Sequence, residues 1–326
     1  MRFGIVGCGL IGRKRAMALP SGHCVTMVAD LDPTRTHALA ADIPGCSWTN
    51  QWQEVVASTA VDALIVAVTH DALAPVTLAA LEHGKHVLVE KPAARNAAEL
   101  EAVLSKARQS GLVVKAGYNH RFHPSILKAR EIVDSGALGP LMFIRGRYGH
   151  GGRKGYESEW RTRKAISGGG ELIDQGTHLI DLARWFLGDF DRVFGITPKA
   201  FWDIEVDDNC FMALQTPASQ VAWLHASWSE WKNMFSLEIY GRDGKLQLEG
   251  LGGSYGIERV THYHMLPEMG PPETTSWEYP FPDRSWHREM AHFIDAVEQG
   301  FPPMSDLNDA LAVLRIVEEI YKESHS

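Results

Sequence analysis

The stretch Gly7-Cys8-Gly9-Leu10-Ile11-Gly12 decides the fold, because it follows the apolar run 3–6 directly and opens a helical pattern. It fits the pattern GxGxxG. Between a strand and a helix, the first glycine permits a tight turn, the second lets the backbone approach a pyrophosphate, and the third lets helix and strand pack closely. The helix N-terminus adds unpaired N–H groups for the phosphates. The stretch therefore predicts a dinucleotide site with contacts from Gly7, Gly9, Leu10, Ile11 and Gly12.

Asp30 supports this prediction, because it ends the next predicted strand, 25–29. A carboxylate at that position can accept hydrogen bonds from the adenosine ribose hydroxyls and would repel a 2′-phosphate, which favours NAD over NADP. Arg35 could pair with a 2′-phosphate, so NADP stays possible. The alternative is a glycine-rich turn in another kind of α/β protein, such as a methyltransferase.

Working outward, the first 117 residues alternate short apolar runs with helical patterns. The apolar runs are residues 3–6, 25–29, 63–68, 86–89 and 112–116, and two of the helical patterns are 33–41 and 97–110. Short apolar strands separated by helices are typical of βαβ units in a parallel sheet that is covered on both faces. We therefore predict a doubly wound α/β domain of the Rossmann type over residues 1–118.

After Tyr118 the pattern changes. A helix is predicted over 124–135, and a last helix over 306–323 is predicted to begin at a Ser305 cap. Between them lie longer segments of alternating hydrophobicity at 141–148, 208–215, 220–228, 235–240 and 245–248. Such segments joined by turns predict a large, mostly antiparallel sheet. Residues 119–326 are therefore expected to form a second, α+β domain.

Composition excludes several classes of function. The chain has 326 residues, with 40 acidic against 32 basic residues, a net charge of −8 and 45% hydrophobic residues. This is an ordinary globular composition, and its negative balance argues against a nucleic-acid partner. The longest apolar run, 63–68, is too short to span a membrane, and residues 1–6 do not resemble a signal peptide. We therefore expect a cytoplasmic protein without a membrane partner. The four cysteines and fifteen histidines lack metal-ligand spacing, so no metal is expected.

Two further motifs carry chemically competent side chains. Glu90-Lys91-Pro92 follows the predicted strand 86–89, at the edge where parallel sheets bind ligands, although a strand-end salt bridge is the alternative. In the stretch 168–181, GGGELIDQGTHLID, Asp174, His178 and Asp181 share one face of a predicted helix, after three glycines that would let the backbone approach cofactor or substrate. A carboxylate beside an imidazole suits proton transfer, and a structural hydrogen bond is the alternative.

Together these motifs resemble the Gfo/Idh/MocA family of oxidoreductases. The resemblance rests on GCGLIG (7–12), Asp30, HGKHVLVEKP (83–92), YNHRFHP (118–124), GGGELIDQGTHLIDLARWFLG (168–188) and HFIDAVEQG (292–300). It implies a Rossmann domain followed by an α/β domain whose sheet commonly forms a dimer or tetramer interface. It also implies that Lys91, Asp174 and His178 lie by the nicotinamide and the substrate hydroxyl.

One departure and several further contacts follow from the resemblance. The family often has a Thr-Pro-Asn-x-x-His-like segment after the fourth strand, whereas Thr69-His70-Asp71 lacks the proline and the downstream histidine. The segment is still expected to border the cofactor. The remaining expected cofactor contacts are Thr69, His70, Glu90 and Lys91, and the expected substrate contacts include Lys91, Tyr118, Arg121, Asp174 and His178.

A basic cluster is particular to this chain. Between residues 145 and 164 there are seven basic residues against Glu157 and Glu159. A solvated loop is one interpretation. The other is an anionic substrate, such as a sugar nucleotide or a uronic acid, bound by Arg153, Arg161 and Arg163.

The sequence therefore predicts an NAD(P)-dependent oxidoreductase that moves a hydride between nicotinamide and a secondary hydroxyl or ketone. The substrate is a sugar, a cyclitol or, as the favoured case, an anionic sugar derivative. His178 would take the hydroxyl proton, Asp174 would orient its ring, and Lys91 would stabilise the alkoxide, with the formal base left open between Lys91 and His178. Two alternatives remain, a non-catalytic regulator of the same fold and an enzyme that keeps its NAD bound without net turnover. A homodimer or homotetramer through the C-terminal sheet is expected.

Overall fold

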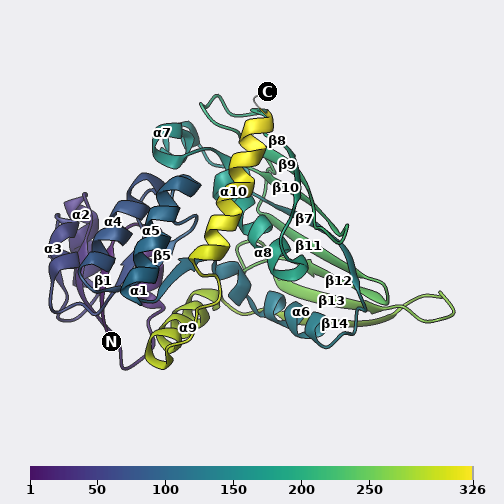
Figure 1. Cartoon of the computed structure of the whole chain (residues 1–326), viewed down its shortest axis with the longest axis horizontal. Helices are drawn as coiled ribbons and strands as arrows, with labels where there is room; N and C mark the ends of the chain where they lie inside the picture. Colours follow the sequence, from purple (N-terminus) through teal and green to yellow (C-terminus); the bar gives the residue numbers. More distant parts are fainter. Residues whose placement is uncertain (325–326) are drawn as a thin grey trace. The chain divides into compact units, whose positions relative to one another are not determined.

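The computed structural model describes residues 1–324, which form two compact units (Figure 1). The main segment of the first unit is Met1–Tyr118, which ends at the residue where the sequence predicted a boundary. Two later segments, Ala165–Gly168 and Trp286–Leu311, also belong to this unit. The second unit is made of Asn119–Lys164, Gly169–Ser285 and the residues from Ala312 onward.

The first unit contains a parallel sheet with the strand order β3-β2-β1-β4-β5-β6, the doubly wound order of dinucleotide-binding folds. Its strands are β1 (Arg2–Val6), β2 (Cys24–Ala29), β3 (Ser47–Thr49), β4 (Ala63–Val66), β5 (His86–Glu90) and β6 (Val114–Gly117). The predicted α/β fold is confirmed. Strand β3 escaped prediction because it has three residues, of which two are exposed, so it carries no apolar pattern.

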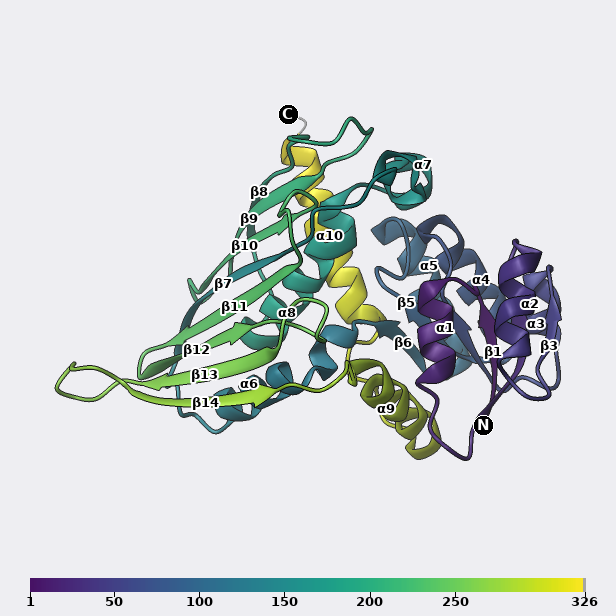
Figure 2. The same cartoon turned by 180° about the vertical axis from the view of Figure 1, so that it is seen from behind.

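Helices lie on both sides of this sheet (Figures 1 and 2). They are α1 (Leu10–Met17), α2 (Pro33–Ala41), α3 (Trp52–Ala57), α4 (His70–Glu82), α5 (Ala97–Ser110) and α9 (Ser285–Gln299). Helices α2 and α5 have the predicted bounds. Asp32 caps the start of α2, where Pro33 is the first helical residue, and α5 has signals at both ends. The Asn96 side chain accepts a hydrogen bond from the Glu99 N–H at the start of α5, and Gly111 ends α5 in a left-handed conformation with φ 67°.

Helix α9 completes the core of the first unit. Its residues Met290 and Phe293 are fully buried in the same apolar cluster as Phe3 and Ile5 of β1. The sequence placed this segment in the second domain, because its partners lie almost 300 positions earlier and leave no local signal.

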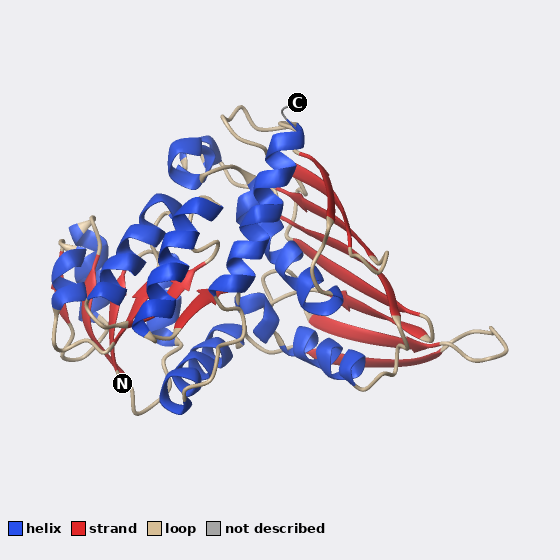
Figure 3. Cartoon of the chain, in the orientation of Figure 1, coloured by secondary structure: helices blue, strands red, loops and turns tan. Residues whose placement is uncertain are grey.

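The second unit contains a large sheet, whose strands are red in Figure 3. Its strand order is β14-β13-β12-β11-β7-β10-β9-β8 (Figure 1). Its strands are β7 (Leu141–Gly149), β8 (Arg192–Ile196), β9 (Asn209–Gln215), β10 (Val221–Ser227), β11 (Met234–Gly241), β12 (Gly244–Glu249), β13 (Glu258–His264) and β14 (Glu273–Tyr279). The pair β7–β10 is parallel and the other neighbouring strands are antiparallel, which confirms the predicted sheet. Strand β14 has no buried residue and therefore gave no alternating pattern.

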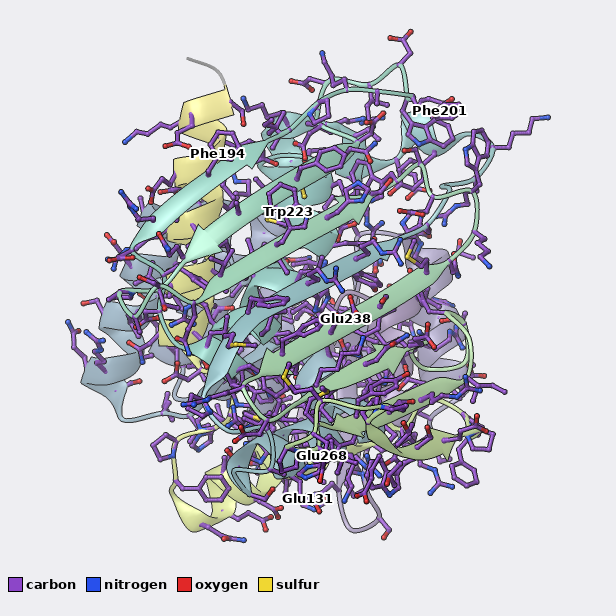
Figure 4. All side chains as sticks on the ribbon, turned by 90° about the vertical axis from the view of Figure 1, so that its right-hand side faces the viewer. Glu131, Phe194, Phe201, Trp223, Glu238 and Glu268 are labelled. Atoms are coloured by element: carbon purple, nitrogen blue, oxygen red, sulfur yellow. The ribbon has the colours of Figure 1, made fainter. Side chains whose placement is uncertain are left out.

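The two faces of this sheet differ. Helices α6 (Pro124–Asp134) and α8 (Thr177–Leu187) pack on one face. The opposite face exposes large apolar side chains, among them Phe194 and Trp223 (Figure 4). The strands alternate between the two environments, as a sheet with one covered face requires.

The remaining helices are short, apart from α10 (Leu307–Ser324). They are η1 (Asn119–Phe122), η2 (Tyr156–Ser158), η3 (Trp160–Thr162), α7 (Lys164–Ser167) and the π-helical turn η4 (Leu172–Gly176). The predicted Ser305 cap of α10 is wrong. Asp306 caps the helix instead, since its carboxylate accepts from the N–H groups of Asn308 and Asp309, at 2.8 and 3.0 Å.

Candidate active site

The glycine loop of the first unit has room for a phosphate group beside its second glycine. A Cβ on Gly7, whose φ is 99°, would lie 2.2 Å from the Ala67 carbonyl oxygen, and a Cβ on Gly12 would lie 1.9 Å from the Gly7 oxygen. A Cβ on Gly9 would meet no atom within 4 Å. The first and third glycines are thus required by the packing of the protein itself, whereas the second leaves open space at the start of α1. This geometry fits a pyrophosphate bound at a helix N-terminus.

Asp30 lies against the same loop. Its carboxylate accepts from the Cys8 N–H at 2.7 Å and from the Asp32 N–H at 2.9 Å. Each carboxylate oxygen keeps a further lone pair for a ribose hydroxyl. The exposed Arg35 pairs with Asp32, with 3.3 Å between nitrogen and oxygen.

Lys91 follows strand β5 in a tight turn. The Ala93 N–H donates to the Glu90 carbonyl at 2.9 Å, and Ala93 has a φ of 73°, which is unusual for a residue other than glycine. The peptide bond between Lys91 and Pro92 is cis. The turn takes Lys91 out of the buried strand into a partly exposed position.

Three other expected cofactor contacts have protein partners. The Glu90 carboxylate accepts from Arg15 Nε at 2.7 Å. The Thr69 hydroxyl donates to Asp71 at 2.6 Å. His70 is 4% exposed, and its Nδ1 lies 2.7 Å from the Ser167 carbonyl oxygen.

In the second unit, Asp174 lies in the π-helical turn η4, and His178 lies in the first turn of α8. Single π-helical turns inside helices recur at functional sites. The carboxyl group of Asp207 holds this turn, since it accepts from the N–H groups of Gly170 and Leu172, at 3.0 and 2.8 Å.

The glycines before the turn allow close packing within the second unit. A Cβ on Gly170 would lie 1.9 Å from the Asp207 carbonyl oxygen, and a Cβ on Gly169 would lie 2.2 Å from the Tyr321 hydroxyl. That hydroxyl also donates to the Asp207 carboxyl group at 2.8 Å. The close approach that the sequence assigned to cofactor or substrate is, at these two glycines, an approach to Asp207 and Tyr321.

His178 lies among aromatic rings. Its imidazole stacks on that of His120, with 3.7 Å between centroids and 21° between planes. Tyr148 meets the two rings edge-on, at 5.1 Å from His120 and 6.1 Å from His178. Burial raises the pKa of Tyr148 well above its ordinary value, so this phenol stays protonated. The stacking fixes the plane of the His178 ring.

Arg161, a predicted substrate contact, lies beside Asp174, and its charge is compensated by acidic neighbours. Its Nε is 3.2 Å from the Asp174 carboxylate, and its Nη1 is 3.4 Å from that of Glu159. Burial lowers the pKa of the guanidinium, and the negative neighbours, Asp174 above all, more than offset this effect. Arg153 also pairs with Glu159, at 2.5 Å. Arg163 is exposed.

The other predicted residues of this unit and its boundary are buried. Arg121 makes two hydrogen bonds to Asp181, at 2.9 and 2.6 Å, and both side chains lie inside the protein. Asp181, predicted to share a face with Asp174 and His178, is therefore a partner of Arg121. Tyr118 is fully buried at the end of the main segment of the first unit.

Sequence reasoning missed His120, Asp207 and Tyr321. His120 stands within the quoted motif at 118–124, but the pattern did not show that its ring would meet His178. Asp207 and Tyr321 are 33 and 147 positions from Asp174. No local pattern could have joined them to it.

The fold and these side chains define a two-domain oxidoreductase with an NAD-binding Rossmann domain. Residues 1–118 match the family described as "Oxidoreductase family, NAD-binding Rossmann fold", and residues 126–247 match the "GFO/IDH/MocA C-terminal domain". The chain belongs to the Gfo/Idh/MocA family. Its expected family and class of enzyme are thereby confirmed.

Among similar proteins are enzymes whose names describe dehydrogenases that act on sugars. The D-xylose 1-dehydrogenase (NADP(+)) 2 of Haloferax volcanii is 26% identical over 329 residues, which cover 100% of this chain and 98% of that protein. The levoglucosan dehydrogenase of Pseudarthrobacter phenanthrenivorans is 27% identical over 205 residues, 59% of this chain and 53% of that protein. A solved structure of levoglucosan dehydrogenase in complex with NADH shares the fold, with a TM-score of 0.89 at 21% identity, over 100% of this chain and 97% of that one.

Two features are absent from residues 1–324. No helix there combines the length and apolar character needed to cross a membrane. No cluster of three or more His, Cys, Asp or Glu side chains there could hold a metal ion.

Proposed function

We propose that the chain catalyses hydride transfer between NAD and a secondary hydroxyl or ketone of a sugar or cyclitol. The observation that carries the proposal is the arrangement of Asp174 and His178 on consecutive helical turns, with the His178 ring fixed by stacking. The open space at Gly9 and the placement of Lys91 after β5 support it from the cofactor side. The sugar dehydrogenases among its relatives favour the same substrate class.

The chemistry divides between cofactor and protein. Bound NAD supplies the hydride acceptor. In the oxidation direction, His178 takes the proton of the substrate hydroxyl at a ring nitrogen as the C–H hydride leaves. Lys91 stabilises the developing alkoxide or shares that proton. Asp174, whose carboxylate is balanced by Arg161, favours the charged imidazole that results.

NAD is the proposed cofactor in preference to NADP. Asp30 holds a negative charge at the ribose position, and Arg35, which a 2′-phosphate would need, is paired with Asp32. Titration of both reduced cofactors tests this preference. We expect NADH to bind at least about tenfold more tightly, as the loss of one charge-assisted contact implies. Equal or tighter NADPH binding would contradict the assignment.

An anionic substrate is the second candidate. Arg161 favours it, because this arginine lies next to Asp174 and is not fully buried. The ion pairs of Arg153 and Arg161 with Glu159 reduce the net charge available, so a neutral sugar or cyclitol fits the site at least as well. Arg163, which is exposed, is the third arginine proposed to bind an anionic substrate.

A substrate screen separates these candidates from one another and from a regulator. Purified protein with NAD would be offered neutral hexoses, pentoses and cyclitols, together with uronic acids and sugar nucleotides, and NADH formation would be followed. We expect turnover of at least one of them, lost in His178→Ala. Binding of a sugar without turnover in either direction would favour a regulator. Turnover of added substrate without release of NADH would favour tightly held NAD.

The exposed face of the second sheet is the proposed subunit interface. Phe194 and Trp223 are 55% and 56% exposed on that face, on β8 and β10, the two strands that flank β9 (Figure 4). Exposed apolar sheet surface of this kind is typical of subunit contacts. We propose a homodimer or homotetramer formed through it, in the cytoplasm. Light scattering of Trp223→Lys should show smaller particles than wild type. The matched control is Phe281→Lys, at a phenylalanine of equal exposure in the loop after β14.

A further inference from the structure

Four charged side chains are buried together in the first unit, and the proposed mechanism uses none of them. They are Arg15 of α1, Glu90 of β5, Lys115 of β6 and Glu289 of α9. Arg15, Lys115 and Glu289 are fully buried, and Glu90 is 8% exposed. Two positive and two negative charges balance, as deep burial requires.

Arg15 is the centre of this cluster. Its Nε and Nη2 lie 2.7 and 2.6 Å from one oxygen of Glu90, and its Nη1 lies 2.5 Å from Glu289. The Lys115 ammonium is 3.0 Å from the other oxygen of Glu289 and also donates to the Ser305 hydroxyl. Trp286 lies along the guanidinium, 4.6 Å from ring centroid to Cζ.

The two carboxylates differ in their surroundings. Burial raises the pKa of Glu90. Burial acts in the same direction on Glu289, but Arg15 and Lys115 together hold the pKa of Glu289 below its ordinary value. Arg15 is the main cationic partner of Glu90, with a weaker contribution from Lys91, whereas Glu289 is held by both Arg15 and Lys115.

The position of the Arg15–Glu90 pair in the chain connects two functional segments. Arg15 is on the helix that opens at the glycine loop, and Glu90 is the residue before Lys91. Space for the pair is kept by Gly117, because a Cβ there would lie 2.9 Å from Arg15 Nη2 and 3.0 Å from Glu90 Oε2. The turn that carries Lys91 therefore begins at a residue whose side chain is anchored to the helix of the cofactor loop.

We propose that Glu90, through Arg15, is a positioning residue for Lys91. The pair sets the start of the Lys91 turn relative to α1, and so relative to anything bound at the N-terminus of that helix. The inference rests on the proposed function, since it needs Lys91 to act on the substrate. Glu289 supports the stability of the unit and has no such role.

Glu90→Gln and Glu289→Gln form a matched pair that tests this assignment. Both remove one buried carboxylate of the same cluster and leave Arg15 with one anionic partner. We expect Glu90→Gln to lower kcat by about 10- to 100-fold, the cost of misplacing a reacting group by about 1 Å, with the NAD Kd nearly unchanged. Glu289→Gln should lower the Tm at least as much, because two cations lose a partner, yet change kcat less than about threefold.

The outcomes separate positioning from structure. Equal losses of kcat in the two variants at a temperature where both are folded, or losses that follow the Tm, would overturn the proposal. If Glu90→Gln does not fold, Glu90→Asp keeps the charge and shortens the reach. Loss of kcat in Glu90→Asp at unchanged NAD Kd supports positioning, and wild-type kcat overturns it.

Lys91→Ala keeps this test distinct from that of the proposed function. Wild-type turnover in Lys91→Ala would remove the role of Lys91 and with it the premise of the inference. Turnover could be lost in Lys91→Ala while Glu90→Gln and Glu289→Gln lose kcat equally. That result would leave the proposed function standing and overturn the inference alone.

Discussion

The glycine loop of the first unit and the π-helical turn of the second are supported by different means. The loop is shaped by backbone atoms that approach where a Cβ cannot fit, as between Gly12 and the Gly7 carbonyl. The turn is held by side chains, above all by Asp207 and its partner Tyr321. The glycine loop should therefore be sensitive to added side-chain volume, and the π-helical turn to the loss of polar groups.

The largest effects are expected for the two side chains proposed to react, Lys91 of the first unit and His178 of the second. His178→Ala and Lys91→Ala should each lower kcat by about 10²- to 10⁴-fold, the usual contribution of a positioned acid or base. NAD binding should stay near the wild-type value, because neither side chain is assigned to the phosphates or the ribose. Steady-state kinetics and a fluorescence titration of NADH measure the two quantities. Near wild-type turnover of His178→Ala would make it a structural histidine.

Two alanine substitutions test the glycine loop, one expected to weaken NAD binding and the other to lower stability. Gly9→Ala places its Cβ in open space, so the Tm should be unchanged while NAD binding weakens by about tenfold or more, since the phosphate loses its close approach. Gly12→Ala forces a Cβ into the Gly7 carbonyl and should cost at least about 1–3 kcal/mol of stability. Thermal unfolding with and without NAD distinguishes them. Unchanged NAD affinity in Gly9→Ala would show that the open space is not the phosphate site.

The π-helical turn is tested by removing its polar support. Asp207→Asn places an amide NH₂ against backbone N–H donors and should cost about 1–3 kcal/mol, with a fall in kcat because the turn carries Asp174. Tyr321→Phe removes one hydrogen bond of the same carboxyl group and should cost about 0.5–1.5 kcal/mol. Denaturant unfolding and kcat are the measurements. If Tyr321→Phe lowered the free energy of unfolding and kcat more than Asp207→Asn, Tyr321 and not Asp207 would be the main support of the turn.

Removal of the Glu258 carboxylate should change stability alone, and the change should depend on pH. Its carboxylate binds His123, Ser125 and the Gly252 N–H. Burial acts to raise the pKa of Glu258, but these partners hold it below its ordinary 4.5. Its stabilisation is therefore complete above pH 4.5 and is lost as the pH falls through the lowered value.

Glu258→Gln should accordingly unfold more easily at pH 7, by about 1–2 kcal/mol. The difference from wild type should shrink below pH 4.5. Denaturant unfolding over a pH series measures it. A difference that stays constant or grows in acid would contradict this account of the Glu258 carboxylate.

The same contrast explains how much could be predicted from sequence. The glycine loop and Asp30 lie within about 25 positions of each other, and Asn96 and Gly111, which flank α5, lie 15 positions apart. Local patterns therefore contained both the fold and the predicted cofactor site of the first unit. Helix α2 and helix α5 were predicted to the residue for the same reason.

The second unit could be predicted only in outline. Alternating hydrophobicity indicated the sheet, but the partners of its polar side chains are remote in sequence. Arg161 was predicted to bind an anionic substrate from the excess of basic residues over 145–164, and that pattern did not show that its guanidinium would pair with Asp174 and Glu159. The motif that made Arg121 a predicted substrate contact likewise did not show its pairing with Asp181, 60 positions away.

The central claim, hydride transfer from a substrate carbon to NAD, has one direct test. A substrate found in the screen would be prepared with deuterium on the carbon that bears the reacting hydroxyl, and the reduced cofactor would be analysed by mass spectrometry. The account predicts one deuterium per NADH formed, a slower reaction than with the unlabelled substrate, and formation of labelled NADH that is about 10²- to 10⁴-fold slower in His178→Ala. Unlabelled NADH, or product formed while the label stays on the sugar or is lost to water, would contradict it.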